Sequence, residues 1–224
     1  MGQAIGQSLT FGVGVALSPF SIIAVVLMLV TARARVNGPV FVVGWFFGLA
    51  VVGAIVLLVA PDAADHAGRP KTWVSVLKLV LGALLVLVAL KNWRGRPHEG
   101  DEVATPRWMG AIDRFTALKA FGAGAVVTAA NPKNALLAVG AAAAIAQAGI
   151  PGGEQAVAYA VFAAVATISV TAPVVIFFAM GDRAPALLDE LKRWMAAHNA
   201  VIMAVLCLVI GVKLIGDAIS GFST

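Results

Sequence analysis

The fold class is decided by residues 38–60, which read GPVFVVGWFFGLAVVGAIVLLVA and contain no charged side chain. At about 1.5 Å per residue, a helix of this length reaches about 35 Å, enough to cross the roughly 30 Å hydrocarbon layer of a bilayer. The whole chain has a similar character: 61% of its 224 residues are hydrophobic, 12% are charged, and its mean hydropathy is +0.95. Soluble domains carry about 25% charged residues. The composition therefore excludes a water-soluble globular protein.

The chain contains further apolar runs, each near or above the roughly 20 residues that a transmembrane helix needs. We therefore predict an all-α integral membrane protein with six transmembrane helices. Trp73 and Trp93 bound the third run, and aromatic residues at the ends of a run are typical of the membrane interfaces. The six runs cover about residues 8–31, 38–60, 73–92, 119–148, 155–181 and 198–219.

A hydrophilic stretch divides the chain into two halves. We predict a first three-helix repeat over residues 1–94, a cytoplasmic linker over 95–118 and a second three-helix repeat over 119–224. Within the second half, residues 185–199 place Leu, Met and Trp side chains at helical spacing, with charged residues largely on the other side. This pattern indicates a helix that lies in the membrane interface or, alternatively, a short polar connector.

The orientation follows from the Lys and Arg residues in the loops. With six transmembrane helices, the connections after the first, third and fifth share one side. Eleven Lys and Arg residues lie on that side, and two, Arg69 and Lys71, lie on the other. The positive-inside rule then puts both termini outside the cytoplasm, in a multi-pass protein of the plasma or inner membrane. The eleven are Arg33, Arg35, Lys91, Arg94, Arg96, Arg107, Arg114, Lys119, Arg183, Lys192 and Arg193.

The two halves contain an internal repeat. Residues 18–21 (SPFS) resemble residues 131–134 (NPKN), and each stretch precedes an aliphatic run. Further along each half, residues 79–82 (LVLG) resemble residues 208–211 (LVIG). Because each half has an odd number of transmembrane helices, the second half must enter the membrane upside down relative to the first. The sequence therefore predicts two inverted repeats, with Pro-broken helices 1 and 4.

Pro19 and Pro132 lie about midway along their apolar runs, near the bilayer midplane. Proline removes a backbone hydrogen bond and leaves carbonyl groups that hydrocarbon cannot satisfy, so these groups must face protein or a wet cavity. Broken helices at equivalent positions of inverted halves are typical of transport sites. The alternative is that both prolines only bend their helices for packing.

Lys133 is the first candidate for substrate binding, because an ammonium near the midplane is costly and needs a partner. Together with neighbouring amides it would suit an anionic group. Alternatively, Lys133 binds the carbonyl groups of a broken helix and fixes the bend. The candidate substrate-binding residues are Lys133, Asn131, Asn134, Pro132, Pro19, Ser18 and Ser21.

Other charged residues in the apolar runs are expected to reach the interface or to pair locally. Lys78 lies near the start of its run, and Lys213 precedes Asp217 by one helical turn, so these two can form an ion pair. Contact with lipid headgroups is the alternative for Lys78 and Lys213.

The sequence gives no support for several other functions. It contains no nucleotide-binding loop, no zinc-binding helix motif and no cluster of His, Cys or carboxylate residues, so we expect no enzyme activity, no metal and no cofactor. The basic residues lie beside apolar runs, which favours lipid headgroups over nucleic acid as partners. The single cysteine, Cys207, lies inside an apolar run.

The 131–134 motif, the two three-helix halves and the glycine-centred third and sixth helices resemble the LysE superfamily of small exporters. The opening residues 16–20 (ALSPF) most resemble its GAP branch, also called the peptidoglycolipid or sulfolipid-addressing proteins. The resemblance implies export, and its Asn-Pro-Lys element carries over onto Asn131, Pro132 and Lys133 only.

We therefore expect an exporter that moves an anionic or amphiphilic cell-envelope lipid by alternating access, with membrane lipids as its partners. The alternatives are an exporter of a small solute such as an amino acid and a non-transporting accessory of a lipid export complex. Gly44 and Gly48 permit close helix packing within one protomer or between two, so a homo-oligomer stays open.

Overall fold

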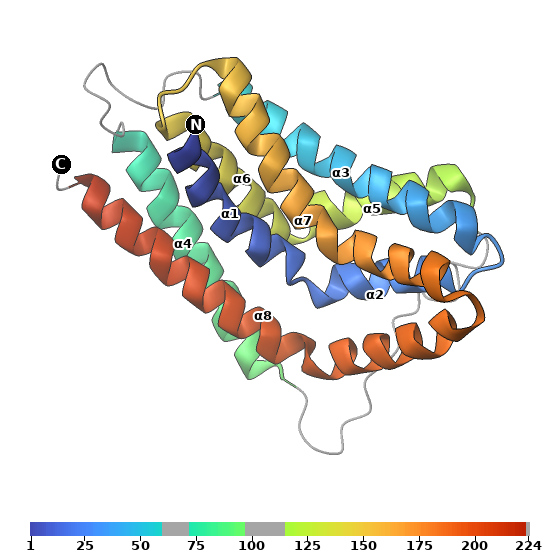
Figure 1. Ribbon diagram of the computed structural model, residues 1–224. Helices are drawn as coiled ribbons and strands as arrows, with labels where there is room; N and C mark the ends of the chain where they lie inside the picture. Colours follow the sequence, from blue (N-terminus) through green and yellow to red (C-terminus); the bar gives the residue numbers. More distant parts are fainter. Residues whose placement is uncertain (60–71, 97–114, 223–224) are drawn as a thin grey trace.

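A computed structural model describes residues 1–59, 72–96 and 115–222, and every regular element in these ranges is helical (Figure 1). The second, third and fifth apolar runs correspond to one helix each to within a few residues, the first and fourth runs each form two helices, and the last helix begins well before its run. The elements are α1 Gly2–Ala16, α2 Pro19–Leu29, α3 Ala34–Val59, α4 Thr72–Arg94, α5 Ala117–Ala130, α6 Pro132–Gln147, α7 Gly152–Met180, the short 3-10 helix η2 Gly181–Arg183, and α8 Ala184–Phe222.

Several of these helices are long and apolar enough to cross a membrane. Three stretches of the described residues meet this requirement: Ala34–Val59, Ser75–Arg94, and Gly152–Phe222, which contains both α7 and α8. The bent pair α1 and α2 brings the number to four if it counts as one crossing. Large apolar side chains such as Leu58 and Leu118 are 78% and 80% exposed, as expected where lipid covers the surface. The chain is a multi-pass membrane protein.

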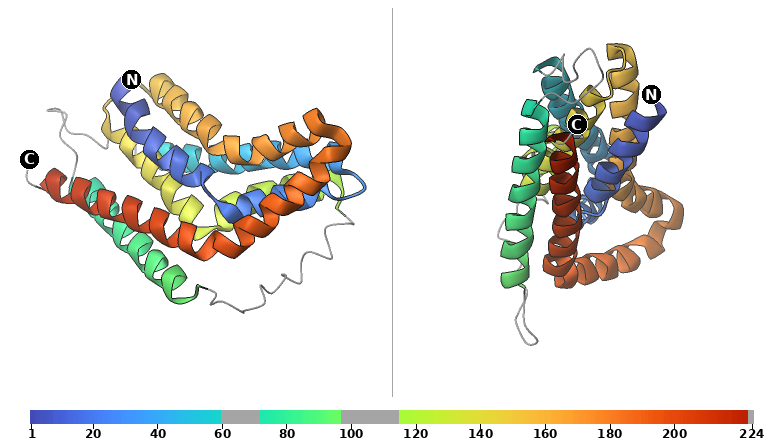
Figure 2. Two further views of the ribbon diagram at one scale, coloured as in Figure 1. Left: turned by 60° about the horizontal axis from the view of Figure 1, so that its bottom comes forward. Right: turned by 90° about the vertical axis from the view of Figure 1, so that its left-hand side faces the viewer.

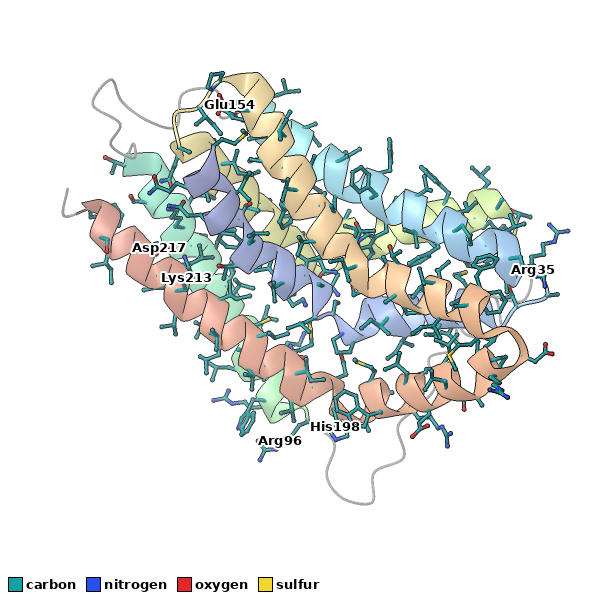
Figure 3. The ribbon with its side chains drawn as sticks, in the orientation of Figure 1. Arg35, Arg96, Glu154, His198, Lys213 and Asp217 are labelled. Atoms are coloured by element: carbon teal, nitrogen blue, oxygen red, sulfur yellow. The ribbon has the colours of Figure 1, made fainter. Side chains whose placement is uncertain are left out.

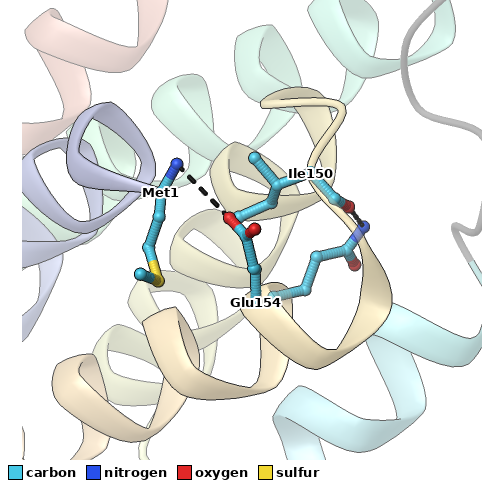
Figure 4. Close-up of polar contacts among 4 residues, drawn as sticks. Met1, Ile150 and Glu154 are labelled. Carbon is cyan, nitrogen blue, oxygen red and sulfur yellow. Dashed lines mark hydrogen bonds and ion pairs between the residues drawn. The ribbon is translucent and has the colours of Figure 1, made fainter.

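The helices pack as pairs drawn from the two halves. α4 runs along α8, α3 runs along α5, and α1 lies between α6 and α7 (Figures 1 and 2). The start of α1 and the end of α8 lie at the same end of the molecule (Figure 1). At this end the Met1 ammonium pairs with a Glu154 carboxylate oxygen at 3.6 Å, which joins the start of α1 to the start of α7 (Figure 4).

Glycine residues allow α3 and α5 to approach backbone to backbone. A Cβ atom added at Gly44 would overlap the backbone of Phe121, and one added at Gly124 would overlap the backbone of Phe41. Gly48 lies one turn after Gly44 and faces the backbone oxygen of Ala125. The close packing expected at Gly44 and Gly48 therefore occurs within one protomer.

A second close approach joins α4 and α8, and it is reciprocal. A Cβ atom at Gly82 would lie 2.8 Å from the Gly211 carbonyl oxygen, and one at Gly211 would lie 2.9 Å from the Gly82 carbonyl oxygen. The two glycines that the repeat aligned therefore touch each other in the fold.

α8 begins well before the last apolar run. The expected amphipathic segment is helical and continuous with that run, and α8 changes direction near His198 (Figure 3). Leu188 is buried, and Leu191 and Met195 pack against the core, whereas Leu187 and Trp194 are exposed. This segment is therefore helical, and its place in the membrane interface stays a prediction.

Some expectations fall on residues outside the described ranges. They concern most of the linker, the side chain of Trp73 and the basic residues Arg69 and Lys71. Trp93, at the other end of α4, is 48% exposed, and the Arg96 guanidinium lies 4.2 Å from its ring centroid. This arrangement is consistent with an interfacial aromatic residue at that end.

Candidate functional site

Two helix breaks form the centre of the molecule. α1 ends at Ala16 and α2 begins at Pro19, with a bend of 56° between them. α5 ends at Ala130 and α6 begins at Pro132. Each proline occupies the first position of the new helix, where its missing N–H is not needed. The residue before each proline has extended backbone angles, which proline favours in its predecessor.

Asn131 stabilises the second break by capping α6. Its Oδ1 accepts hydrogen bonds from the backbone N–H groups of Lys133 at 3.1 Å and of Asn134 at 3.4 Å. These groups have no partner inside the helix, so the cap replaces water that a membrane interior does not supply. Asn131 therefore has a structural task at this position.

The two breaks touch each other through a buried polar chain. Asn134 Nδ2 donates to Ser21 Oγ at 3.4 Å, and Ser21 Oγ donates to Ser18 Oγ at 3.0 Å. All three side chains are fully buried. Because Asn134 and Ser21 come from different halves of the chain, the fold brings the equivalent motifs of the repeat together.

Lys133 connects the second break to the end of α1. Its side chain is 1% exposed, and its Nζ donates to the carbonyl oxygens of Gly14 at 2.8 Å and Leu17 at 3.2 Å. These carbonyls lie where α1 ends, so they lack helical partners and carry the negative end of the helix dipole. No carboxylate among the described residues lies within ion-pairing distance of Lys133. The geometry matches the interpretation in which Lys133 binds carbonyl groups of a broken helix.

Lys133 also borders a cavity of about 650 Å³. The cavity extends from the second break to the last turn of α4, between α4, α5 and the middle of α8. Asn199 contributes a buried Oδ1 that has no hydrogen-bond partner in the described part of the chain. The lining residues are Phe20, Val88, Lys91, Asn92, Gly95, Val126, Val127, Asn131, Pro132, Lys133, Asn199 and Met203.

The predicted site residues divide between this cavity and the buried chain behind it. Asn131, Pro132 and Lys133 line the cavity. Ser18, Pro19, Ser21 and Asn134 do not line it, because they are buried where the two breaks meet. The polar groups that sequence reasoning did not assign to the site are Lys91, Asn92 and Asn199.

The missed residues lie at the ends of apolar runs. Lys91 and Asn92 close the third run; by sequence, Lys91 counts only among the residues that set orientation, and Asn92 has no assigned role. Asn199 is the second residue of the run 198–219. A polar amide inside an apolar run was the only feature of the sequence that could have indicated its place in the site. Their convergence depends on the crossing of α4 and α8, which no local pattern specifies.

This cavity and the close α1–α6 contact lie on opposite sides of the breaks. α1 packs closely along α6: Gly14 faces Leu137 and Ile210, and Gly140 faces the ring of Phe11. In the predicted repeat, the pair equivalent to α1 and α6 is α5 and α2, which make few contacts. The cavity occupies that position, between Phe20 of α2 and Val126 and Val127 of α5. The helices α1 and α6 are therefore packed against each other, whereas α5 and α2 are separated by the cavity.

Fold and site together define a multi-pass helical membrane protein in which two Pro-broken helices meet at a buried lysine beside a one-sided cavity. A family model described as Sap, sulfolipid-1-addressing protein, matches residues 9–220, and the chain belongs to this family. No curated protein and no solved structure matches the chain. The family agrees with the sulfolipid-addressing branch that the sequence resembled, and the wider relationship to the LysE superfamily stays a prediction.

Proposed function

We propose that this protein is a lipid exporter of the plasma or inner membrane, not an enzyme, and that it moves an anionic envelope lipid of the sulfolipid kind by alternating access. The substrate class is taken from the name of the family to which the chain belongs. The observation that carries the proposal is the cavity beside the two breaks, because its lining combines two lysine residues, Lys91 and Lys133, with amide side chains and an apolar wall. Such a lining suits a molecule that has a charged headgroup and hydrocarbon chains.

The proposal includes six membrane crossings arranged as two inverted halves, α1 to α4 and α5 to α8, of the LysE-superfamily type. The reciprocal contact of Gly82 and Gly211 supports this symmetry, because a two-fold axis between the halves would relate these residues. The packing of α3 on α5 and of α1 on α7 supports it too, since the repeat exchanges these pairs. Both termini would then lie outside the cytoplasm.

In this mechanism the described conformation is open toward the cytoplasm. The cavity ends at Lys91 and Asn92, on the side that holds most Lys and Arg residues, and the α1–α6 contact closes the opposite side. Alternating access would exchange the two contacts: α1 would separate from α6 while α5 closes on α2. Inverted repeats give both arrangements similar packing, which keeps the two states close in free energy.

Lys133 would couple substrate binding to this exchange. An anionic headgroup in the cavity competes with the carbonyl oxygens of Gly14 and Leu17 for the ammonium, because a charged acceptor makes the stronger hydrogen bond. When the headgroup accepts the hydrogen bonds of Lys133 Nζ, the carbonyl groups at the end of α1 lose the partner that holds them against α6. Asn131 positions Lys133 through its cap, while Ser18, Pro19, Pro132, Ser21 and Asn134 shape the contact between the breaks.

The first test is a thermal-shift screen of the purified protein in detergent against anionic lipids and amino acids, repeated with Lys133→Gln. Lys192→Gln is the control, because Lys192 pairs with Asp189 in the segment of α8 before its bend, outside the cavity. We expect anionic lipid to raise the melting temperature of the protein and of the control, and to have little effect on Lys133→Gln. Stabilisation by an amino acid alone would instead indicate the small-solute exporter.

The second test measures flux of a fluorescent anionic lipid across proteoliposomes. The unmodified protein and Lys192→Gln should move the lipid, and Lys133→Gln should lose most of this flux while keeping its helical circular dichroism. A folded Lys133→Gln protein with full flux would refute the assignment of Lys133. Absence of flux in all three proteins would refute the exporter and indicate a non-transporting accessory.

A further inference from the structure

A basic cluster lies away from the cavity, where α4 and α8 run side by side toward the end of the molecule that holds the start of α1 and the end of α8. It consists of Ser75, Lys78, Lys213 and Asp217, and we call it the outer cluster. Lys213 Nζ and Asp217 Oδ2 are 2.7 Å apart, and their side chains are 38% and 39% exposed (Figure 3). Lys78 is partly buried and lies one turn before Gly82 on α4, and Gly82 faces Ile215, which lies between Lys213 and Asp217 on α8. None of the four lines the cavity.

The outer cluster has an excess of positive charge. It contains two ammonium groups, those of Lys78 and Lys213, and one carboxylate, that of Asp217. The neighbouring helices α1, α4 and α6 contain no Asp or Glu. Lys213 is already bound to Asp217 and lies over the ring of Phe11, 6.0 Å from its centroid. Among the described residues of the cluster, two ammonium groups therefore share one carboxylate, which leaves an excess of one positive charge.

A buried hydroxyl group, that of Ser75, lies one helical turn before Lys78 on α4. Ser75 is 1% exposed, and its Oγ has no hydrogen-bond partner in the described part of the chain. Buried hydroxyl groups in proteins are almost always bonded, because an unpaired one loses its bonds to water without replacement. Ser75 precedes Lys78 by three residues, so both side chains lie on one face of α4. The same face of α4 therefore carries a hydroxyl donor and an ammonium donor.

We propose that the outer cluster binds an oxyanion of the phosphate or sulfate class, with Lys78 and Ser75 as its donors and Lys213 as a second cation. Lys78 lies six residues after Thr72, about 9 Å along the helix from its start, which is a depth that a lipid headgroup or a solution ion can reach. Asp217 competes with the oxyanion for the two ammonium groups. The inference rests on the proposed function only for its role, as the place where an exported headgroup arrives.

The test measures anion binding to the full-length protein in detergent, from the rise in melting temperature with ligand concentration. The probes are phosphatidylglycerol, phosphatidylcholine as the uncharged control, and sodium sulfate against sodium chloride at equal ionic strength. The variants are Lys78→Gln, Ser75→Ala and Asp217→Asn, with Lys192→Gln as a control in the segment of α8 before its bend. The cavity is unchanged in all of them, so its own contribution cancels in the comparison.

We expect Lys78→Gln to weaken binding about tenfold, the effect of one lost charge-assisted hydrogen bond, and Ser75→Ala to weaken it less. Asp217→Asn should tighten binding severalfold, because the competing carboxylate is gone. This opposite sign separates an anion site from general loss of structure. A response to phosphatidylglycerol and to sulfate supports a site open to water, and a response to phosphatidylglycerol alone supports a headgroup site.

Equal affinities of the unmodified protein, Lys78→Gln and Asp217→Asn would overturn the proposal, as would no response to either anion. The result is independent of transport. A protein without flux that keeps the Lys78-dependent response would refute the exporter and retain the outer cluster. A protein that transports lipid but lacks the Lys78-dependent response would support the exporter and refute the outer cluster as an anion site.

Discussion

Replacing Gly124 by Ala should destabilise the protein, because α3 and α5 approach each other too closely for a side chain. A Cβ atom at Gly124 would overlap the carbonyl oxygen of Phe41 and lie 2.7 Å from the backbone nitrogen of Trp45. Both neighbours are backbone atoms inside a helix, so they cannot rotate away as a side chain does. The two helices must separate, and the packing along their contact is lost.

The size of this effect follows from a matched control on the same helix. Gly122 has no atom within 4 Å of an added Cβ, so Gly122→Ala should gain up to about 1 kcal/mol from helix propensity. Overpacking costs about 1–3 kcal/mol, and Gly124→Ala gains the same propensity term at most. The two variants should therefore differ by at least about 1 kcal/mol, and by more if α3 and α5 separate along their length.

Thermal unfolding in detergent, followed by far-UV circular dichroism, measures this difference. For a chain of this size, 1 kcal/mol corresponds to a change of about 2–4 °C in melting temperature. Gly124→Ala should melt at least about 2 °C below Gly122→Ala, and the larger residues Val and Leu should widen the gap. Equal melting temperatures of the two Ala variants, and of the two Leu variants, would refute the close approach of α3 and α5.

Three further predictions concern burial and orientation. The Cys207 thiol is fully buried, so it should resist a bulky maleimide in the folded protein and react after denaturation in SDS, as measured by a gel shift; rapid labelling of the native protein would contradict its place in the core. In a Cys207→Ser background, a membrane-impermeant maleimide added to intact cells should label Gln3→Cys and spare Arg35→Cys, and the reverse pattern would show that the orientation is inverted. Tyr159 Oη donates to the Leu49 carbonyl oxygen at 2.9 Å, so Tyr159→Phe should cost about 0.5–1.5 kcal/mol and lower the melting temperature by a few degrees, whereas an unchanged melting temperature would argue against this bond.

The sequence was a good guide wherever a property depends on neighbours along the chain. The length of an uncharged run predicts a membrane helix, and the runs 38–60 and 73–92 correspond to α3 and α4 to within a few residues. Pro19 and Pro132 mark helix starts, because the proline ring restricts the preceding residue and removes an N–H group. The spacing of Lys213 and Asp217 was enough to predict their ion pair, since i and i+4 side chains meet on any helix.

Lys133 shows where such reasoning stops. The free-energy cost of an ammonium group in the membrane predicts that Lys133 has a partner. Both an anionic substrate and helix carbonyl groups satisfy that prediction. The partners in the fold, Gly14 and Leu17, lie more than a hundred positions away in the chain. Only the packing of α1 on α6 brings them within hydrogen-bond distance, and no pattern near residue 133 contains that information.

The sequence by itself determined the membrane class, the helices and the two breaks, because these follow from run length, hydropathy and proline geometry within a single turn or run. Tertiary structure alone decided which glycines face which backbone, which side of the breaks is open, and which polar groups meet at the cavity. These features depend on how helices from opposite halves cross, and the crossings are set by side-chain packing between segments far apart in the chain.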